Sequence, residues 1–102
     1  MTDVIQYSPA LDFGTAAELL DAMSNAKRLR VLQLLAGNEM SVNALAAEVD
    51  LSQSALSQHL QKLRLANLVE PRRQAQNIYY AIKSPAVLAV LDALRQLYHE
   101  DA

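Results

Sequence analysis

The sequence predicts a mainly α-helical α+β domain, in which four helices precede a β-hairpin and a fifth helix follows it. Apolar residues recur at helical spacing in four segments before residue 67 and in one segment after residue 84. Between them lie two β-rich segments, LVEPRR and NIYYAI, separated by short polar residues. The 102 residues, 52% of them hydrophobic, suffice for one domain with an apolar core.

The N-terminal segment differs from the rest of the chain. Residues 1–14 show no hydrophobic period and are interrupted by proline and glycine, which predicts an N-terminal arm. A single domain over residues 15–102 follows. Thr15 and Glu18 have the spacing of a capping box, so we expect a first helix to begin at Thr15 and to end near residue 23.

Polar capping residues separate the next three helices. Ser24 or Asn25 can cap a second helix, which ends at the glycine of LLAG. Ser41 begins a short third helix, and VDLS then forms a tight turn. Ser52 caps a fourth helix that runs to about Ala66. A short helix, a turn and a longer helix together indicate a helix-turn-helix.

The end of the chain predicts a wing and a closing helix. The two β-rich segments form a hairpin joined at residues 74–76, and Pro71 confines its first strand to an edge or to irregular pairing. Ser84 followed by Pro85 predicts the cap and first turn of a helix that ends near Glu100. The order α-α-α-α-β-β-α is that of a winged helix-turn-helix.

The fourth helix carries an unusual exposed face in the stretch LSQSALSQHL. At 100° per residue its leucines share one face, which we expect to be buried, and Ser, Gln and Lys occupy the opposite face. Short neutral hydrogen-bonding groups suit base edges in the major groove, whereas a row of glutamates would be repelled by phosphates. An ordinary solvated face is the alternative, and the helix, turn and hairpin around it favour base reading.

Composition and charge distribution narrow the classes of function. The net charge is −2, yet residues 52–83 carry +4 and the remainder −6, a pattern expected when one face meets phosphate. The lack of cysteine excludes disulfides, thiolate metal sites and cysteine nucleophiles. No apolar run reaches the ~18–20 residues of a membrane span, and the start MTDVIQYSPALD is unlike a signal peptide. We expect a cytoplasmic protein, at the nucleoid when bound to DNA.

Three runs of sequence carry a family resemblance: KRLRVLQLL, SVNALAAEVDLSQSALSQHLQKLRLANLVEPRR and IYYAI. They resemble the ArsR/SmtB family of bacterial transcription regulators over residues 18–98, and SQSALSQHL followed by LR is close to the recognition-helix signature of that family. Within the family the chain is most similar to the NolR/HlyU-like branch. The resemblance implies a homodimer, paired through its first and last helices, that binds an imperfect palindrome in promoter DNA. We expect such a regulator to repress transcription by blocking access of the polymerase.

The helical wheel and the resemblance together predict contacts with double-stranded DNA from the fourth helix and the wing. The candidates are Gln53, Ser54, Ser57, Gln58, His59, Gln61, Lys62, Arg72, Arg73 and Gln76. Ser54 and Gln58 point most directly away from the leucine face, so we expect them to read bases. We expect Ser52 to cap the fourth helix and not to contact bases.

Several of these candidates have alternatives. His59 lies at the margin of the leucine face, where it either contacts a phosphate or packs inward with a ring nitrogen bonded to backbone. Arg72 and Arg73 match basic wing positions of the family, and strand alternation sends them to opposite faces, so only one contacts DNA strongly. Lys62 and Arg64 are candidates for backbone contact, with a solvated charge as the alternative. Gln76 and its neighbour Asn77 replace the more basic wing tip common in the family.

The closing helix has apolar residues around more of its circumference than one intramolecular contact needs, which indicates a partner. The expected dimer residues are Leu19, Leu20, Val87, Leu88, Leu91, Leu94, Leu97 and Tyr98. The alternative is a helix buried entirely against its own domain. A two-fold dimer would bind half-sites roughly 34–36 Å apart.

The sequence gives little support for a metal site or for an enzyme active site. Asp92 and His99 of the last helix are seven residues apart, and the only other histidine, His59, lies in another helix. Two possible ligands with this spacing make a poor transition-metal site. We expect no metal or other cofactor, and no effector is identified. No serine, histidine and acid are arranged for catalysis, so we predict no enzyme. Two alternatives stay open: an activator that displaces a silencing protein from DNA, and a winged-helix module that binds another protein.

Overall fold

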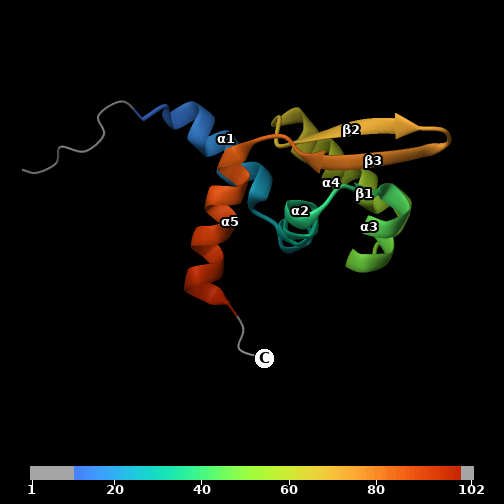
Figure 1. Ribbon diagram of the computed structural model, residues 1–102. Helices are drawn as coiled ribbons and strands as arrows, with labels where there is room; N and C mark the ends of the chain where they lie inside the picture. Colours follow the sequence, from blue (N-terminus) through green and yellow to red (C-terminus); the bar gives the residue numbers. More distant parts are fainter. Residues whose placement is uncertain (1–10, 100–102) are drawn as a thin grey trace, which may run out of the picture.

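The computed structural model describes residues 11–99 of the chain. This part of the chain forms five helices and a three-stranded antiparallel sheet (Figure 1). The elements are α1 (Phe13–Met23), α2 (Ala26–Gly37), β1 (Met40–Ser41), α3 (Val42–Val49), α4 (Gln53–Leu65), β2 (Val69–Gln74), β3 (Asn77–Ile82) and α5 (Pro85–Tyr98). The predicted winged helix-turn-helix order is confirmed, with β1 as an additional strand.

Three of the predicted helix caps are confirmed. Asn25, Ser41 and Ser52 precede α2, α3 and α4, and each side-chain oxygen accepts hydrogen bonds from backbone N–H groups in the first turn of its helix. These N–H groups have no partner within the helix, and a cap that satisfies one of them contributes about 1 kcal/mol. Ser84 precedes Pro85 as predicted, although its side chain makes no capping hydrogen bond.

The predicted start of the first helix is wrong. The N-cap of α1 is Asp12, whose Oδ1 accepts from the Thr15 backbone N–H at 3.1 Å and whose Oδ2 accepts from the Thr15 hydroxyl at 2.8 Å. Thr15 therefore donates to a cap three residues earlier and is not itself the cap. Phe13 and Gly14, which we assigned to the arm, belong to the first turn of α1. Residues 1–10 of the predicted arm lie outside the described residues.

The sheet has the order β1-β3-β2, so β2 is an edge strand, as Pro71 predicted. Gln74 pairs with Asn77, and the turn therefore consists of two residues and not of the three that we expected. Ala75 in this turn has a φ of 56°, in the left-handed region that costs a residue with a Cβ roughly 1–2 kcal/mol. The wing thus closes without a glycine.

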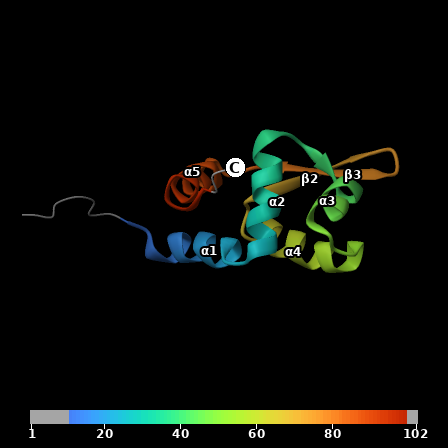
Figure 2. The same ribbon diagram turned by 90° about the horizontal axis from the view of Figure 1, so that it is seen from below.

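The core surrounds α2, which contacts each of the other helices and β3 (Figure 2). Leu56, Leu60 and Leu63 of α4 are at most 2% exposed, which confirms the predicted leucine face. They pack in one cluster with buried side chains from α2, α3, the hairpin and α5. Because α4 is fixed by this face, its Ser and Gln side chains are held toward solvent. No helix in residues 11–99 has the length and apolarity to cross a membrane.

Candidate nucleic-acid interface

The exposed face of α4 is as polar as its sequence predicted. α4 follows α3 through a tight turn in which Asp50 adopts the left-handed conformation, with a φ of 56°. The five candidates Gln53, Ser54, Ser57, Gln58 and Gln61 are all exposed. They form a neutral surface of hydrogen-bonding groups, held by the buried leucines behind it.

A groove of about 390 Å³ separates α4 from the wing. From the helix it is lined by Gln53, Ser57, Gln61 and Arg64, and from the wing by Gln76, Asn77 and Ile78. The structure therefore brings together four predicted residues of α4, with Arg64 among them, and the predicted Gln76 of the wing tip. Ser54 and Gln58 do not line the groove and lie on the outer face of α4.

Asn43 is a polar group at this groove that the sequence analysis missed. It lies in the first turn of α3, and its Oδ1 accepts a hydrogen bond from Nε2 of Gln53. This contact orients the Gln53 amide at the start of α4. Nothing in the local sequence indicates the pairing, because it depends on how α3 packs against α4.

His59 and Lys62 lie on the opposite flank of α4, toward α2 and α1. His59 is half-buried, and its Nδ1 is 3.1 Å from Nη1 of Arg28. Since a guanidinium can only donate, Nδ1 accepts and the imidazole is neutral, with its proton on Nε2. Arg28 also donates through Nε to the Ala22 carbonyl at 2.6 Å. Lys62 Nζ is 2.8 Å from the carboxylate of Asp21.

These contacts tie α4 to the body of the domain. Of the two alternatives for His59, the structure favours inward packing, with a guanidinium as the partner in place of the expected backbone group. The Lys62 pair is largely exposed, and such pairs contribute little to stability because water screens them. Contact of either residue with DNA stays a prediction.

The environment of His59 makes stability depend on pH. Its burial, together with the positive charges of Arg28 and Lys27, holds the pKa of the imidazole below its ordinary value of 6.5. Below about pH 6.5 the imidazole of His59 is protonated in the unfolded chain but stays neutral to a lower pH in the folded chain. The free energy of unfolding should therefore fall as the pH decreases from 7.5 to 5.

Urea unfolding across this range checks the expectation, with His59→Gln as the comparison. The carboxyls of Asp12, Asp21 and Glu39 also have lowered pKa values, but they lose their stabilising charge only below their ordinary range near pH 4. The variant should show a flatter pH dependence between pH 7.5 and 5. Identical slopes for both proteins would show that another group is responsible.

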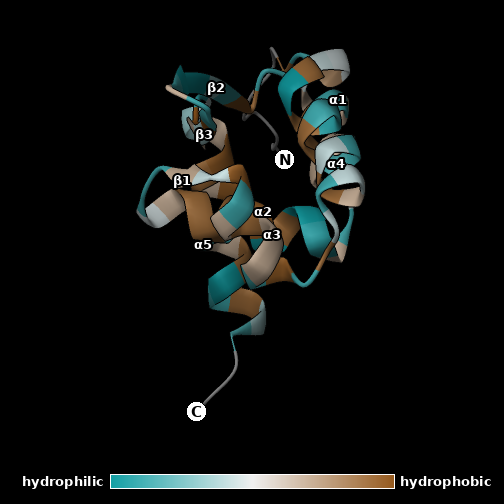
Figure 3. Ribbon diagram, turned by 90° about the vertical axis from the view of Figure 1, so that its right-hand side faces the viewer, coloured by the Kyte–Doolittle hydropathy of each residue, from teal (hydrophilic) through white to brown (hydrophobic). Residues whose placement is uncertain are grey.

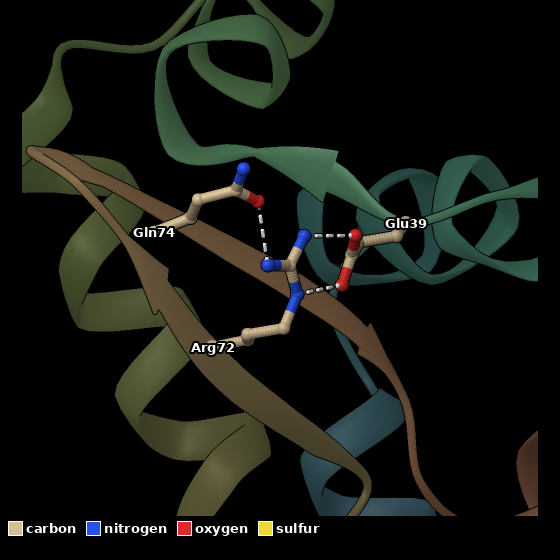
Figure 4. A network of polar contacts seen from close by, with 3 residues as sticks. All are labelled: Glu39, Arg72 and Gln74. Atoms are coloured by element: carbon tan, nitrogen blue, oxygen red, sulfur yellow. Dashed lines mark hydrogen bonds and ion pairs between the residues drawn. The ribbon is translucent and has the colours of Figure 1, made fainter.

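The two arginines of the wing lie on opposite faces of the hairpin, as predicted. Arg72 pairs across the sheet with Tyr79, and Arg73 with Ile78. Both Nε and Nη2 of Arg72 donate to the carboxylate of Glu39, at 2.9 and 2.6 Å (Figure 4). Its Nη1 donates to Oε1 of Gln74 at 2.7 Å, and the guanidinium lies 4.9 Å from the Tyr79 ring centroid. This pairing holds the pKa of the Glu39 carboxyl below its ordinary value.

Arg73 faces α4. It lines a smaller cavity together with Arg64, Pro71, Ile78 and Tyr80. β2 is exposed from Glu70 to Gln74 and is hydrophilic over most of its length (Figure 3). Within residues 11–99, the wing therefore presents toward the helix an arginine without an ion-pair partner, and on its other face an arginine paired with Glu39.

Unpartnered apolar side chains cover parts of α1 and α5. Leu20, Leu88, Leu97 and Tyr98 are 56%, 44%, 69% and 75% exposed. Among the other predicted dimer residues, Val87 is buried and Leu19, Leu91 and Leu94 are half-buried. The alternative of a closing helix buried entirely within its own domain is therefore wrong. Phe13, at 77% exposed, extends this surface on α1 and was missed because we placed it in the arm.

The two helices lie at one end of the molecule, away from the tip of the wing (Figures 1 and 2). Within residues 11–99 no group of three His, Cys, Asp or Glu side chains could hold a metal ion. Asp92, one of the two residues considered as ligands, instead accepts hydrogen bonds from Arg95 and from Gln96.

Comparison with protein families and curated proteins gives consistent matches. The model for bacterial regulatory proteins of the arsR family matches residues 25–71. Nodulation protein NolR of Rhizobium meliloti is 57% identical over 90 residues, which cover 88% of this chain and 74% of NolR. Transcriptional activator HlyU of Vibrio cholerae is 47% identical over 83 residues, or 81% of this chain and 77% of HlyU.

Solved structures agree with these matches. HlyU from Vibrio cholerae N16961 superposes with a TM-score of 0.83 at 42% identity, over 90% of this chain and all of that chain. The homodimeric winged helix-turn-helix DNA-binding domain Mb0332 from Mycobacterium bovis gives a TM-score of 0.73 at 31% identity. That match covers 88% of this chain and 90% of the other.

Proposed function

Because the chain belongs to the ArsR family of bacterial regulatory proteins, we propose that it is a homodimeric regulator that binds a two-fold symmetric operator in promoter DNA and represses transcription. One observation carries the proposal. The outer face of α4 is a fixed surface of exposed Ser and Gln side chains beside a groove that the wing borders. A helix of this kind after a short helix and a turn enters the major groove.

Ser54 and Gln58 are the proposed base-reading residues. Both lie on the outer face of α4, within the N-terminal half of the helix that approaches the bases. A glutamine amide can hydrogen-bond to N6 and N7 of adenine at once, and a serine hydroxyl can donate or accept. Gln53, Ser57 and Gln61, which line the groove, lie between these readers and the wing and are proposed to contact the adjoining backbone and bases.

The exposed apolar side chains of α1 and α5 support a dimer. Mb0332, with the same fold, is described as homodimeric. In this chain four large apolar side chains of these two helices, Leu20, Leu88, Leu97 and Tyr98, are each at least 44% exposed. Grouped exposed apolar side chains are typical of interaction surfaces. A second copy of the chain would cover it and place two α4 helices about one turn of DNA, roughly 34–36 Å, apart.

Repression follows from occupancy, since a dimer bound across a promoter excludes RNA polymerase. HlyU is named as an activator, which favours displacement of a silencing protein as the second candidate. Transcription in vitro from a promoter that overlaps the bound site separates the two. Repression predicts less transcript on bare DNA. Activation by displacement predicts no loss on bare DNA and recovery on DNA coated with a silencing protein.

Gln58→Ala tests the reading role. The variant should lose about 1–3 kcal/mol of binding free energy for a specific site and should relax one base preference, since an alanine cannot make the paired hydrogen bonds. Binding to random duplex should change little. Fluorescence anisotropy with both duplexes measures this, and Gln33→Ala, at an exposed glutamine of α2, is the matched control. Equal losses on both duplexes would remove Gln58 from base reading.

A further inference from the structure

Most cations of the chain have a partner in their own protomer. All nine Lys and Arg residues lie within residues 11–99. Ion pairs or hydrogen bonds to acceptor groups occupy Lys27, Arg28, Arg30, Lys62, Arg72 and Arg95. Within the described residues Arg64, Arg73 and Lys83 have no such acceptor.

Two of these three cations meet at one place. Arg64 from α4 and Arg73 from β2 line the same cavity of about 260 Å³, whose other walls are Pro71, Ile78 and Tyr80. Among residues 11–99, no carboxylate lines this cavity. The acid nearest in sequence, Glu70, points to the other face of the hairpin, since it alternates with Pro71 along β2. Two arginines at one cavity that no described carboxylate lines provide positive charge and N–H donors suited to an anion such as phosphate.

The cavity adjoins the groove beside α4. Arg64, Ile78 and Tyr80 line both. A DNA strand that follows the groove between α4 and the wing therefore passes over the two arginines. Guanidinium groups bind phosphate oxygens through paired hydrogen bonds, and Arg64 and Arg73 are both exposed and so accessible to such a group.

We propose that Arg64 and Arg73 form a phosphate-binding notch for the DNA backbone, and that Arg72 is a positioning residue that makes no DNA contact. This inference rests on the proposed function. Arg72 already directs three of its N–H groups at Glu39 and Gln74 and stacks on Tyr79 (Figure 4). Three of its five N–H donors and its contact with the Tyr79 ring are thus directed within the protomer, whereas Arg73 has no such acceptor in the described residues. Its pairing with Glu39, in the segment before β1, holds the wing at a fixed angle.

The salt dependence of binding to a selected duplex tests the notch. Each phosphate contact contributes about 0.9 to the slope of log K against log salt concentration, so one contact in each protomer of a dimer contributes about 1.8. Arg64→Gln and Arg73→Gln should each reduce the slope by about that amount. Lys83→Gln removes the same charge from the third unpaired cation, outside the notch, and should leave the slope nearly unchanged.

Glu39→Gln distinguishes a positioning role of Arg72 from a contacting one. If Arg72 positions the wing, Glu39→Gln and Arg72→Gln should weaken binding to similar extents without changing the slope, and the double variant should be no weaker than either. If Arg72 contacts phosphate, Glu39→Gln frees it and should strengthen binding. That result would overturn the assignment.

The same variants distinguish a free phosphate compound from the DNA backbone as the ligand of the notch. They also distinguish failure of the notch from failure of the proposed function. If the notch serves a free phosphate compound, inorganic phosphate will shift the Arg64 and Arg73 Nε–H signals by NMR at millimolar concentration without DNA, and the two variants will keep the wild-type slope on DNA. That outcome overturns the DNA notch alone, as does any unchanged slope in these variants. Failure of the wild-type protein to bind any duplex overturns both the notch and the proposed function.

Discussion

Replacement of Leu97 by glutamate is expected to convert the protein from a dimer into a monomer and to weaken operator binding about 10²- to 10⁴-fold. Leu97 is 69% exposed in the single protomer, so a glutamate there loses little intramolecular packing. In a dimer the same carboxylate would be buried without a partner, which is strongly unfavourable. Binding then loses the avidity that two linked recognition helices provide.

Sedimentation equilibrium measures the oligomeric state, and anisotropy with a selected duplex measures affinity. Gln33→Glu is the control, because it adds the same charge at an exposed position of α2 that is not part of the α1 and α5 surface. The control should remain dimeric. A Leu97→Glu protein that also remains dimeric would place the interface elsewhere.

Leu63→Ala is expected to destabilise the protein by about 2–5 kcal/mol, which is the usual cost of truncating a fully buried leucine. Leu63 is 0% exposed and packs in the cluster that holds α4 against the domain. Its loss removes apolar contacts and leaves a cavity that the surrounding helices cannot fully close. A domain of this size has only about 5–15 kcal/mol of stability, so a large share would be lost.

Leu65→Ala is the matched control, two residues further along the same helix. Leu65 is 74% exposed, and its truncation should change the free energy of unfolding by no more than about 0.5 kcal/mol. Urea denaturation of both variants at one protein concentration makes the comparison, since the stability of a dimer depends on concentration. Similar losses for the two leucines would contradict the burial pattern of α4.

Features that depend on neighbouring residues were predictable from the sequence. Asn25, Ser41 and Ser52 cap their helices through backbone groups two or three residues away, and such signals lie within the local sequence. The predicted start of α1 is wrong because Asp12 and Thr15 are both residue types that can cap a helix. Which of them is the N-cap depends on whether Phe13 and Gly14 belong to the helix. β1 has two residues, too few to show a period.

In the candidate interface, too, the features set by local sequence were predictable and the contacts between distant residues were not. The neutral face of α4 follows from helical periodicity, and it was predicted. The pairing of Arg72 with Glu39 joins residues 33 positions apart, and that of His59 with Arg28 joins residues 31 apart. Contacts at such separations are created by the packing of whole elements, so no local pattern indicates which cations are engaged and which are free. Arg64 and Arg73 could be distinguished from Arg72 only in the folded protein.

Selection of binding sites from a pool of random duplexes by the purified protein, with and without EDTA, is the most direct test of base reading by α4. We expect a two-fold symmetric motif with half-sites roughly 34–36 Å apart, unchanged by EDTA. The motif would also identify candidate promoters. Enrichment of no sequence at moderate salt would contradict base reading, and the exposed faces of α4 and α5 would then be better explained as surfaces that bind another protein.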